Sequence, residues 1–239
     1  MKKNILLKGP LLSRSGYGEQ ARFALRALQS RPELFEIYVL NINWGQTGHL
    51  TTNDEEHQWI LRRIQETAVF AQQGGTFDIS IQVTVPNEFE KIAPVNIGYT
   101  AGIETTKCSG QWIEKINAFV ERVITISAHS QKVMENTTYD VKDQQGNEIK
   151  DWGINVPVDY VSYPHLETEP EPLELNINTT NNFLVVAQWS PRKNLENTIR
   201  WFVEKFAEDP TAGLILKTNT ASDSIRDREF TSQRLQALL

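Results

Sequence analysis

The feature that most constrains the fold is a repeated alternation of short apolar runs with segments of helical periodicity. Strand-length apolar runs followed by helix-length amphipathic segments are typical of a mostly parallel sheet that helices cover on both faces. The sequence therefore predicts an α/β, Rossmann-like domain. Strands are expected at residues 4–7, 36–42, 77–85, 95–99, 122–126 and 156–163, and helices at 18–29, 54–72, about 110–120 and 128–136.

One of these strands alternates polar and apolar side chains. In residues 77–85, Ser80, Gln82 and Thr84 lie between apolar neighbours, so one face of the strand is polar. Since a polar face is usually solvated, this strand is expected near a sheet edge or a cleft. A polar stretch at residues 139–152 interrupts the alternation and predicts a hairpin or flap.

The longest predicted helix, residues 54–72, has an expected start, a buried face and an end. A capping box of Thr52 with Glu55, or of Asn53 with Glu56, would begin it. Gly74 and the glycine after it would end it. Its expected buried residues are Ile60, Leu61, Ile64, Ala68 and Ala71.

The carboxyl-terminal part contains a second strand–loop–helix unit, residues 182–202. Its strand is a continuous apolar run at 183–186, the pattern of a strand buried on both faces. The sequence predicts a first domain at 1–166, a polar linker at 167–181 and a second domain at 182–239. Only one further strand and one helix follow, and two strands do not make a stable covered sheet alone. The second domain is therefore expected to be incomplete, with apolar surface that favours self-association.

Composition excludes several classes of function. A net charge of -6 argues against a nucleic-acid or anionic-membrane binder. Cys108 is the only cysteine, which fits a reducing, cytoplasmic location, and no apolar run approaches the ~20 residues of a transmembrane helix. The four histidines show no metal-ligand spacing, so no metal is expected.

Arg192 and Lys193 lie in the loop that precedes the helix of the 182–202 unit. A helix start presents unpaired N–H groups and the positive end of the helix dipole, so this turn predicts an anion site. The alternative is that both cations are simply solvated. Lys217 follows a buried run at the carboxyl end of the next strand, where ligands bind in open parallel sheets.

A glycine-rich turn after the first strand gives a second candidate site. Gly16, Tyr17 and Gly18 precede a helix, and glycine permits close approach of the backbone to a ligand. The spacing does not fit a dinucleotide fingerprint, because Gly16 comes eight residues after Lys8, so no dinucleotide cofactor is expected. Two further polar residues follow strand ends: Glu104 as a possible helix-start carboxylate and Ser127 as a possible cap.

Taken together, several segments resemble retaining glycosyltransferases of the GT-B fold, the large "group 1" family. The resemblance runs from about residue 4 to 217 and rests on the order and spacing of loose motifs. These motifs are LLSRSGYGEQAR, VTVPNEFEK, NIGYTAGIETTK, RVITISAHSQKVM, FLVVAQWSPRKNLENTI and LILKT.

The resemblance implies two Rossmann-like domains, an amino-terminal one for the acceptor and a carboxyl-terminal one for a nucleotide-sugar donor. In that family an arginine and a lysine hold the donor diphosphate. Lys193 matches the lysine, Gln188 occupies the arginine position and Arg192 is the substitute, while Asn194 replaces a glycine. The family's paired glutamates would lie beyond Leu239, so the chain is expected to be truncated.

The leading hypothesis is a glycosyltransferase that moves a hexose, with retention, from a nucleotide diphosphate sugar to a glycan or other hydroxyl acceptor. Donor-binding candidates are Gly16, Tyr17, Gly18, Arg192, Lys193 and Lys217. Glu104 and His129 are candidates for orienting acceptor or sugar hydroxyls in catalysis. The alternatives are a non-catalytic glycan- or protein-binding fragment and a sugar epimerase of the same two-domain plan.

Overall fold

The computed structural model describes residues 2–142 and 145–238 of the chain, which divides into two compact units. The first unit comprises Met1–Trp44 and Leu50–His165, and the second comprises Gly45–His49 and Leu166–Leu239. The long carboxyl-terminal stretch of the second unit begins at Leu166. The short Gly45–His49 segment groups with the second unit, so the first unit is not one continuous stretch of sequence.

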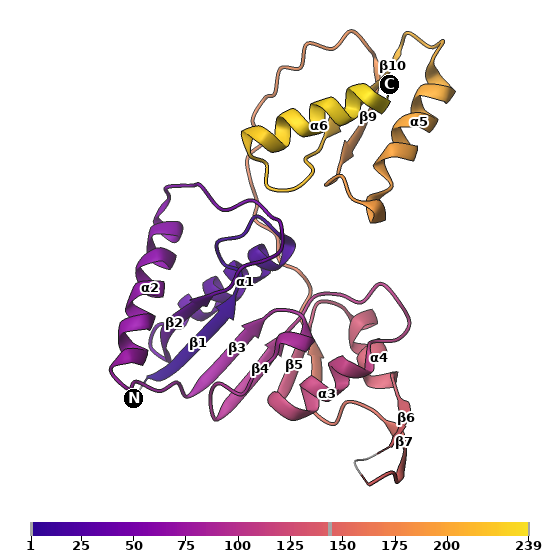
Figure 1. Ribbon diagram of the computed structural model, residues 1–239. Coiled ribbons are helices and arrows are strands. Elements are labelled where there is room, and N and C mark those ends of the chain that lie inside the picture. The colour runs from indigo at the N-terminus through magenta and orange to yellow at the C-terminus, as the bar shows by residue number, and fades with distance from the viewer. Residues whose placement is uncertain (1, 143–144, 239) are drawn as a thin grey trace. The chain divides into compact units, whose positions relative to one another are not determined.

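A six-stranded parallel sheet forms the centre of the first unit, in the order β2-β1-β3-β4-β5-β8 (Figure 1). The order reverses between β1 and β3, as in doubly wound α/β folds, and the predicted Rossmann-like α/β class is confirmed for this unit. The strands are β1 (Lys3–Gly9), β2 (Phe35–Asn41), β3 (Ile79–Val83), β4 (Val95–Tyr99), β5 (Arg122–Thr125) and β8 (Val158–Tyr160). The helices are α1 (Gly16–Gln29), α2 (Glu55–Gln72), α3 (Gly110–Phe119), α4 (Ala128–Asn136) and a single 3-10 turn, η1 (Pro86–Glu88).

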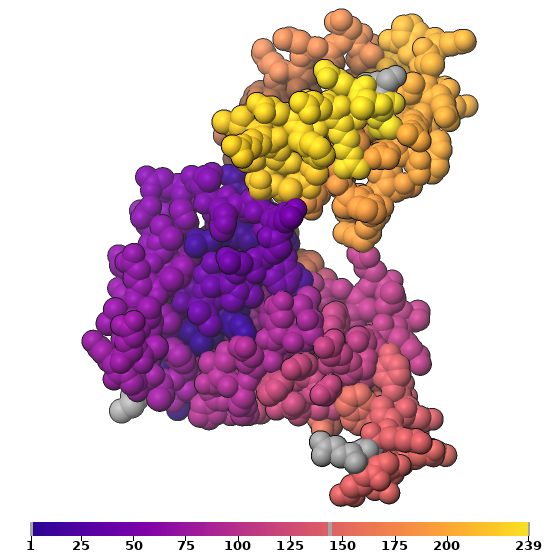
Figure 2. Space-filling view, viewed as in Figure 1, coloured from indigo at the N-terminus to yellow at the C-terminus, as the bar shows by residue number. Residues whose placement is uncertain are grey.

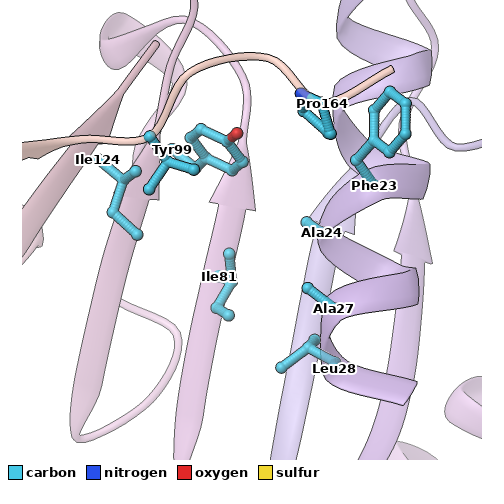
Figure 3. A pocket seen from close by; sticks show the side chains of 9 residues that line it. Phe23, Ala24, Ala27, Leu28, Ile81, Tyr99, Ile124 and Pro164 are labelled. Atoms are coloured by element: carbon cyan, nitrogen blue, oxygen red, sulfur yellow. The ribbon is translucent and has the colours of Figure 1, made fainter. Parts of the chain in front are cut away.

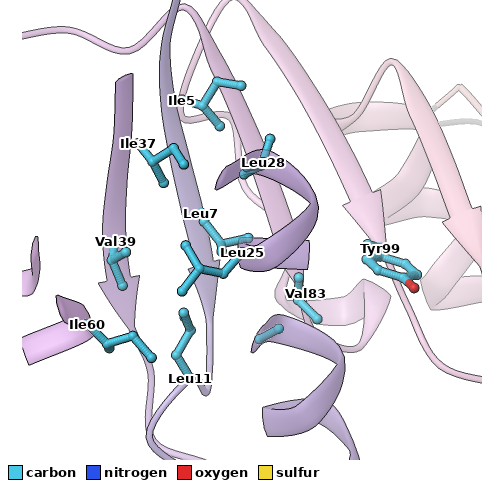
Figure 4. Close-up of a cluster of buried hydrophobic side chains, with 11 residues drawn as sticks. Ile5, Leu7, Leu11, Leu25, Leu28, Ile37, Val39, Ile60, Val83 and Tyr99 are labelled. Atoms are coloured by element: carbon cyan, nitrogen blue, oxygen red, sulfur yellow. The ribbon is translucent and has the colours of Figure 1, made fainter. Parts of the chain in front are cut away.

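One face of this sheet is apolar and packs against α1. Ile5 and Leu7 of β1 are buried in one cluster with Leu25 and Leu28 of α1 (Figure 4). Ile60 of α2 belongs to the same cluster. At ~25 cal/mol per Å² of apolar area removed from water, such clusters provide most of the stabilisation of the fold.

The opposite face contains buried polar side chains, which corrects the expectation for residues 77–85. β3 is the third strand of the sheet, and Ser80, Gln82 and Thr84 are all 0% exposed. Hydrogen bonds to other residues satisfy them. Ser80 donates to Asn96 Oδ1 over 2.8 Å, and Gln82 Nε2 donates to the Glu90 carbonyl over 2.7 Å. The segment after η1 covers this face, so the polar alternation marks an internal network and not an edge.

Helix α2 differs from its prediction in its cap and in its buried face. Asp54 caps it by accepting a hydrogen bond from His57 N over 2.8 Å, so neither expected capping box forms. The buried face contains Thr67, whose hydroxyl accepts from Val39 N of the edge strand β2. The helix thereby covers an open sheet edge. Of the predicted buried residues, Ile60 is buried, whereas Leu61, Ala68 and Ala71 are exposed.

A second apolar cluster lies under α3 and α4. Ser127 caps α4, as predicted, and Ser109 caps α3. The predicted hairpin is also present, as antiparallel β6 (Tyr139–Lys142) and β7 (Glu148–Trp152). It extends away from the six-stranded sheet (Figures 1 and 2). Within the described part of the chain, residues 161–180 form neither helix nor strand, and β8 is shorter than the predicted 156–163.

The second unit contains a separate two-stranded parallel sheet, formed by the strand predicted at 183–186 and the further strand predicted after it. Phe183 packs against Phe202 and Phe206 on one face. On the other face Leu184 is 66% and Val186 is 64% exposed, so the expectation that this strand is buried on both faces is wrong. The elements are β9 (Asn181–Val186), η2 (Pro191–Lys193), α5 (Leu195–Phe206), β10 (Ala212–Lys217) and α6 (Ile225–Leu238).

Candidate functional site

The first group of candidate residues lies at the carboxyl end of β1. Gly16, Tyr17 and Gly18 form the first turn of α1, not a loop before it, because Ser15 is the N-cap and accepts from Gly18 N over 3.0 Å. A Cβ on Gly18 would approach the Ser13 carbonyl oxygen to 2.1 Å, so this glycine allows the loop to fold against the helix. A Cβ on Gly16 would meet nothing within 4 Å.

Tyr17 connects this turn to the carboxyl end of β4. Its hydroxyl lies 3.0 Å from Thr100 Oγ1 and accepts from Ala101 N at the same distance. Its ring packs on Trp44, with centroids 4.4 Å apart. Burial raises the pKa of the Tyr17 hydroxyl, which remains protonated at neutral pH. The side chain therefore fixes the two loops and presents a neutral hydroxyl between them.

Glu104 and His129 lie at the same edge of the sheet, on the β4–α3 loop and the first turn of α4. His129 Nε2 is 3.3 Å from the Thr105 carbonyl oxygen, which holds the imidazole beside the loop containing Glu104. Both side chains are exposed. The structure thus places both candidates at this edge of the sheet with exposed side chains.

Ser127 caps α4, as the sequence had suggested. Its hydroxyl accepts from Ser130 N over 3.1 Å and lies 3.0 Å from Ser130 Oγ. Ser130 Oγ in turn accepts from Ile103 N. The pair therefore positions the backbone beside Glu104.

Sequence reasoning missed a polar group where the sheet order reverses, near the carboxyl ends of β1 and β3. Lys8 is 6% exposed, and its ammonium donates to Glu90 over 2.6 Å and to the Glu88 carbonyl over 3.2 Å. Thr84 bonds the Glu88 carboxylate. The alternating polar residues of 77–85 were the available signal for it. These contacts hold residues 84–90 against the polar face of the sheet.

In the second unit, Arg192 and Lys193 are exposed on the η2 turn, directly before α5. Asn194 adopts the left-handed conformation, with φ 50°, and makes no side-chain cap to the helix. Asparagine tolerates this conformation better than most residues, so it can stand where a glycine would otherwise be needed. The first turn of α5 therefore begins without a side-chain cap and beside two cations.

Lys217 lies at the carboxyl end of β10, opposite Val186 at the end of β9. The loops after the two strands are joined, because Ala187 N donates to the Lys217 carbonyl and Trp189 N to that of Asn219. Trp189 is 4% exposed, and the guanidinium carbon of Arg234 lies over its ring, 4.6 Å from the centroid. A buried tryptophan thus fixes the loop that holds the exposed cations.

The described residues include no group of three or more histidine, cysteine, aspartate or glutamate side chains placed to hold a metal ion. Over the same residues, no helix is both long enough and apolar enough to cross a membrane. Comparison of the chain with protein-family models, with curated proteins and with solved structures finds no match.

Proposed function

We propose that this protein is a glycosyltransferase that moves a hexose, with retention, from a nucleotide diphosphate sugar to a hydroxyl acceptor. The observation that carries the proposal is the turn between β9 and α5. It combines two exposed cations, a helix start without a side-chain cap, and an asparagine in the conformation that a glycine would supply. The two cations and the uncapped helix start favour binding of a diphosphate.

The second unit would hold the donor. As the bond between the anomeric carbon and the diphosphate oxygen breaks, negative charge develops on the departing diphosphate. Arg192, Lys193 and the N–H groups of the first turn of α5 would stabilise this charge. Lys217 follows the adjacent strand on the same edge, so its ammonium is a further candidate contact. The buried Trp189 anchors the loop, which would reduce the ordering cost of binding.

The first unit would position the acceptor. Glu104 lies on the β4–α3 loop and His129 on the first turn of α4, at the same edge of the sheet, where a carboxylate and an imidazole can accept hydrogen bonds from hydroxyl groups. Gly16, Tyr17 and Gly18 form a rigid helix start at this edge, with the Tyr17 hydroxyl fixed by Thr100. In the GT-B proteins that the chain resembles, the corresponding glycine-rich segment adjoins the donor phosphates.

Calorimetric titration with UDP, GDP and ADP tests the donor site. Lys193→Ala is expected to weaken nucleoside diphosphate binding by roughly tens of fold, because a charge-assisted hydrogen bond is worth ~1.5–3 kcal/mol. The matched control is Lys205→Ala, another exposed lysine in the last turn of α5. Its affinity should equal that of the unmodified chain.

Equal affinity of the Lys193 and Lys205 variants would show that the turn is only a solvated loop. Product analysis then separates the enzymatic alternatives. A transferase consumes the nucleotide sugar only with an acceptor, whereas an epimerase converts it alone. An absence of nucleotide binding together with retained glycan binding would favour a non-catalytic binding module.

A further inference from the structure

The apolar groove of the first unit is not suited to a phosphorylated ligand. Ile81, Tyr99 and Ile124 form its floor, and Ala24 and Ala27 of α1 form one wall (Figure 3). None of the nine residues that line it is charged, so a phosphate there would lose its hydration without compensation. The charged side chains that bear on the proposed donor lie instead in the second unit, around the first turn of α5.

Glu196 places a negative charge in the turn that is proposed to bind a diphosphate. It belongs to the first turn of α5, directly beside the cations of the η2 turn. The hydrogen bond that it accepts from Arg234 holds the pKa of its carboxyl below the ordinary value, so the group is ionised at neutral pH. A carboxylate at this position competes with a phosphate for the positive helix end and repels the phosphate itself.

Arg234 of α6 compensates for this charge. Its Nη2 atom donates to Glu196 Oε1 over 2.6 Å, although the two residues lie 38 positions apart in the sequence. Its guanidinium also lies over the ring of the buried Trp189. One side chain thus connects the first turn of α5 with the loop that leads into η2. The side chains of Arg234 and Glu196 remain 36% and 44% exposed, so their charges can act on a nearby anion.

The start of α6 holds Arg234 in place. Asp227 lies about two helical turns before it and is 8% exposed. The Asp227 carboxylate accepts hydrogen bonds from backbone N–H groups of the loop after β10, those of Thr220, Ala221 and Asp223. Leu235, the residue after Arg234, packs against the apolar cluster of the second unit. The packing of α6 therefore fixes where the guanidinium of Arg234 can lie.

We propose that Arg234 is a positioning residue of the donor site. It neutralises Glu196 and anchors Trp189, which leaves the N–H groups of α5 and the cations of the η2 turn available to a diphosphate. Arg234 acts through these two side chains and is not itself a ligand contact. The inference rests on the proposed function, to which it adds a role for α6 in the affinity for the donor.

Calorimetric titration of the full chain with inorganic pyrophosphate tests the inference. Arg234→Gln should lower the affinity by about two- to fivefold, because the charge of Glu196 is then uncompensated at a partly solvated site. Glu196→Gln should raise the affinity by a similar factor, because it removes the repulsion. The matched control is Arg226→Gln, the same charge change at an exposed residue in the first turn of α6, and it should leave the affinity unchanged.

The opposite signs of the two effects separate this role from a purely structural one. A salt bridge that only connects α5 with α6 is broken equally by either substitution, so both variants would lose affinity and Tm together. The double variant, Arg234→Gln with Glu196→Gln, should bind pyrophosphate more tightly than Arg234→Gln alone. Glu196→Gln keeps the shape of an exposed side chain, so it tests the same charge even if Arg234→Gln unfolds.

The inference is overturned if Arg234→Gln binds pyrophosphate as tightly as the unmodified chain, or if Glu196→Gln also weakens binding. Lys193→Ala distinguishes this failure from a failure of the donor site, because it weakens pyrophosphate binding only if the turn before α5 holds the diphosphate. An unmodified chain without measurable pyrophosphate binding would overturn both the donor site and the role of Arg234.

Discussion

Strands β3 and β9 have opposite sequence patterns and opposite environments. β3 alternates polar and apolar residues, and its polar side chains are completely buried. β9 contains a continuous apolar run, yet Leu184 and Val186 are mostly exposed. The difference teaches that the burial of a strand depends on how many elements surround it. Polar residues remain inside where each finds a hydrogen-bond partner, and apolar residues remain outside where no layer covers them.

The strongest test of this comparison removes the centre of the polar network. Asn96 Oδ1 accepts hydrogen bonds from Ser80 Oγ and from the N–H groups of Ile92 and Ala93. Asn96→Leu leaves these three donors without this acceptor, and each such group costs ~1–3 kcal/mol, so we expect the free energy of unfolding to fall by at least about 3 kcal/mol. Urea denaturation measures it. Asn87→Leu, on the exposed η1 turn, is the control and should change stability little.

The second test compares the covered and open faces of the β9–β10 sheet. Ile199→Ala removes a residue that is 2% exposed and should destabilise this unit by about 2–5 kcal/mol. Leu184→Ala, on the open face, should change stability by less than about 0.5 kcal/mol. Hydrogen exchange at the amides of Val185 and Leu216 measures the stability of this unit separately from that of the six-stranded sheet.

In the unmodified chain, the amides of Val185 and Leu216 should exchange faster than those of Ile97 and Ile124 in the six-stranded sheet. The reason is that β9 and β10 have fewer neighbouring layers. Equal protection of the two pairs of amides in a monomeric sample would contradict the comparison. The exposed face of β9 would then not lower the stability of the second unit.

A smaller effect is expected where the segment after η1 packs on the six-stranded sheet, at Phe89 and Gly98. A Cβ on Gly98 of β4 would approach the Phe89 ring to 2.4 Å. Gly98→Ala should therefore cost ~1–3 kcal/mol through overpacking. Gly16→Ala is the control, because that position is open and alanine favours a helix by up to about 1 kcal/mol. Thermal unfolding that ranks the two variants in the reverse order would contradict the described packing of Phe89.

The smallest expected effect is on the pH dependence of the first unit. Partial burial raises the pKa of Glu121, but hydrogen bonds from Lys91 and Asn96 N outweigh it and leave the pKa below its ordinary value. Because the folded-state pKa is depressed, the carboxylate stabilises the fold above the unfolded-state pKa, and this contribution is lost as pH falls through the folded-state value. Glu121→Gln should flatten the fall in urea midpoint between pH 7 and pH 3. Glu114→Gln, an exposed control on α3, should leave the profile unchanged.

The sequence by itself determined the local elements of this protein. Periodicity located the strands and helices of the parallel sheet, and residues that can bond the backbone, such as Ser109 and Ser127, fixed two helix starts. The cations Arg192 and Lys193 were also placed correctly before a helix, because the strand–loop–helix order is local. These features depend on interactions between residues that are close in the chain.

Only the tertiary structure decided which of these surfaces are buried. Thr67 is inside because it satisfies an edge amide of β2, and Ser80 is inside because Asn96 lies on the neighbouring strand. The Nε2 of Gln20, which has no hydrogen-bond partner among the described residues, likewise becomes visible only when α1 is packed on the sheet. Burial and hydrogen-bond satisfaction depend on partners that are distant in the sequence, so local periodicity cannot specify them.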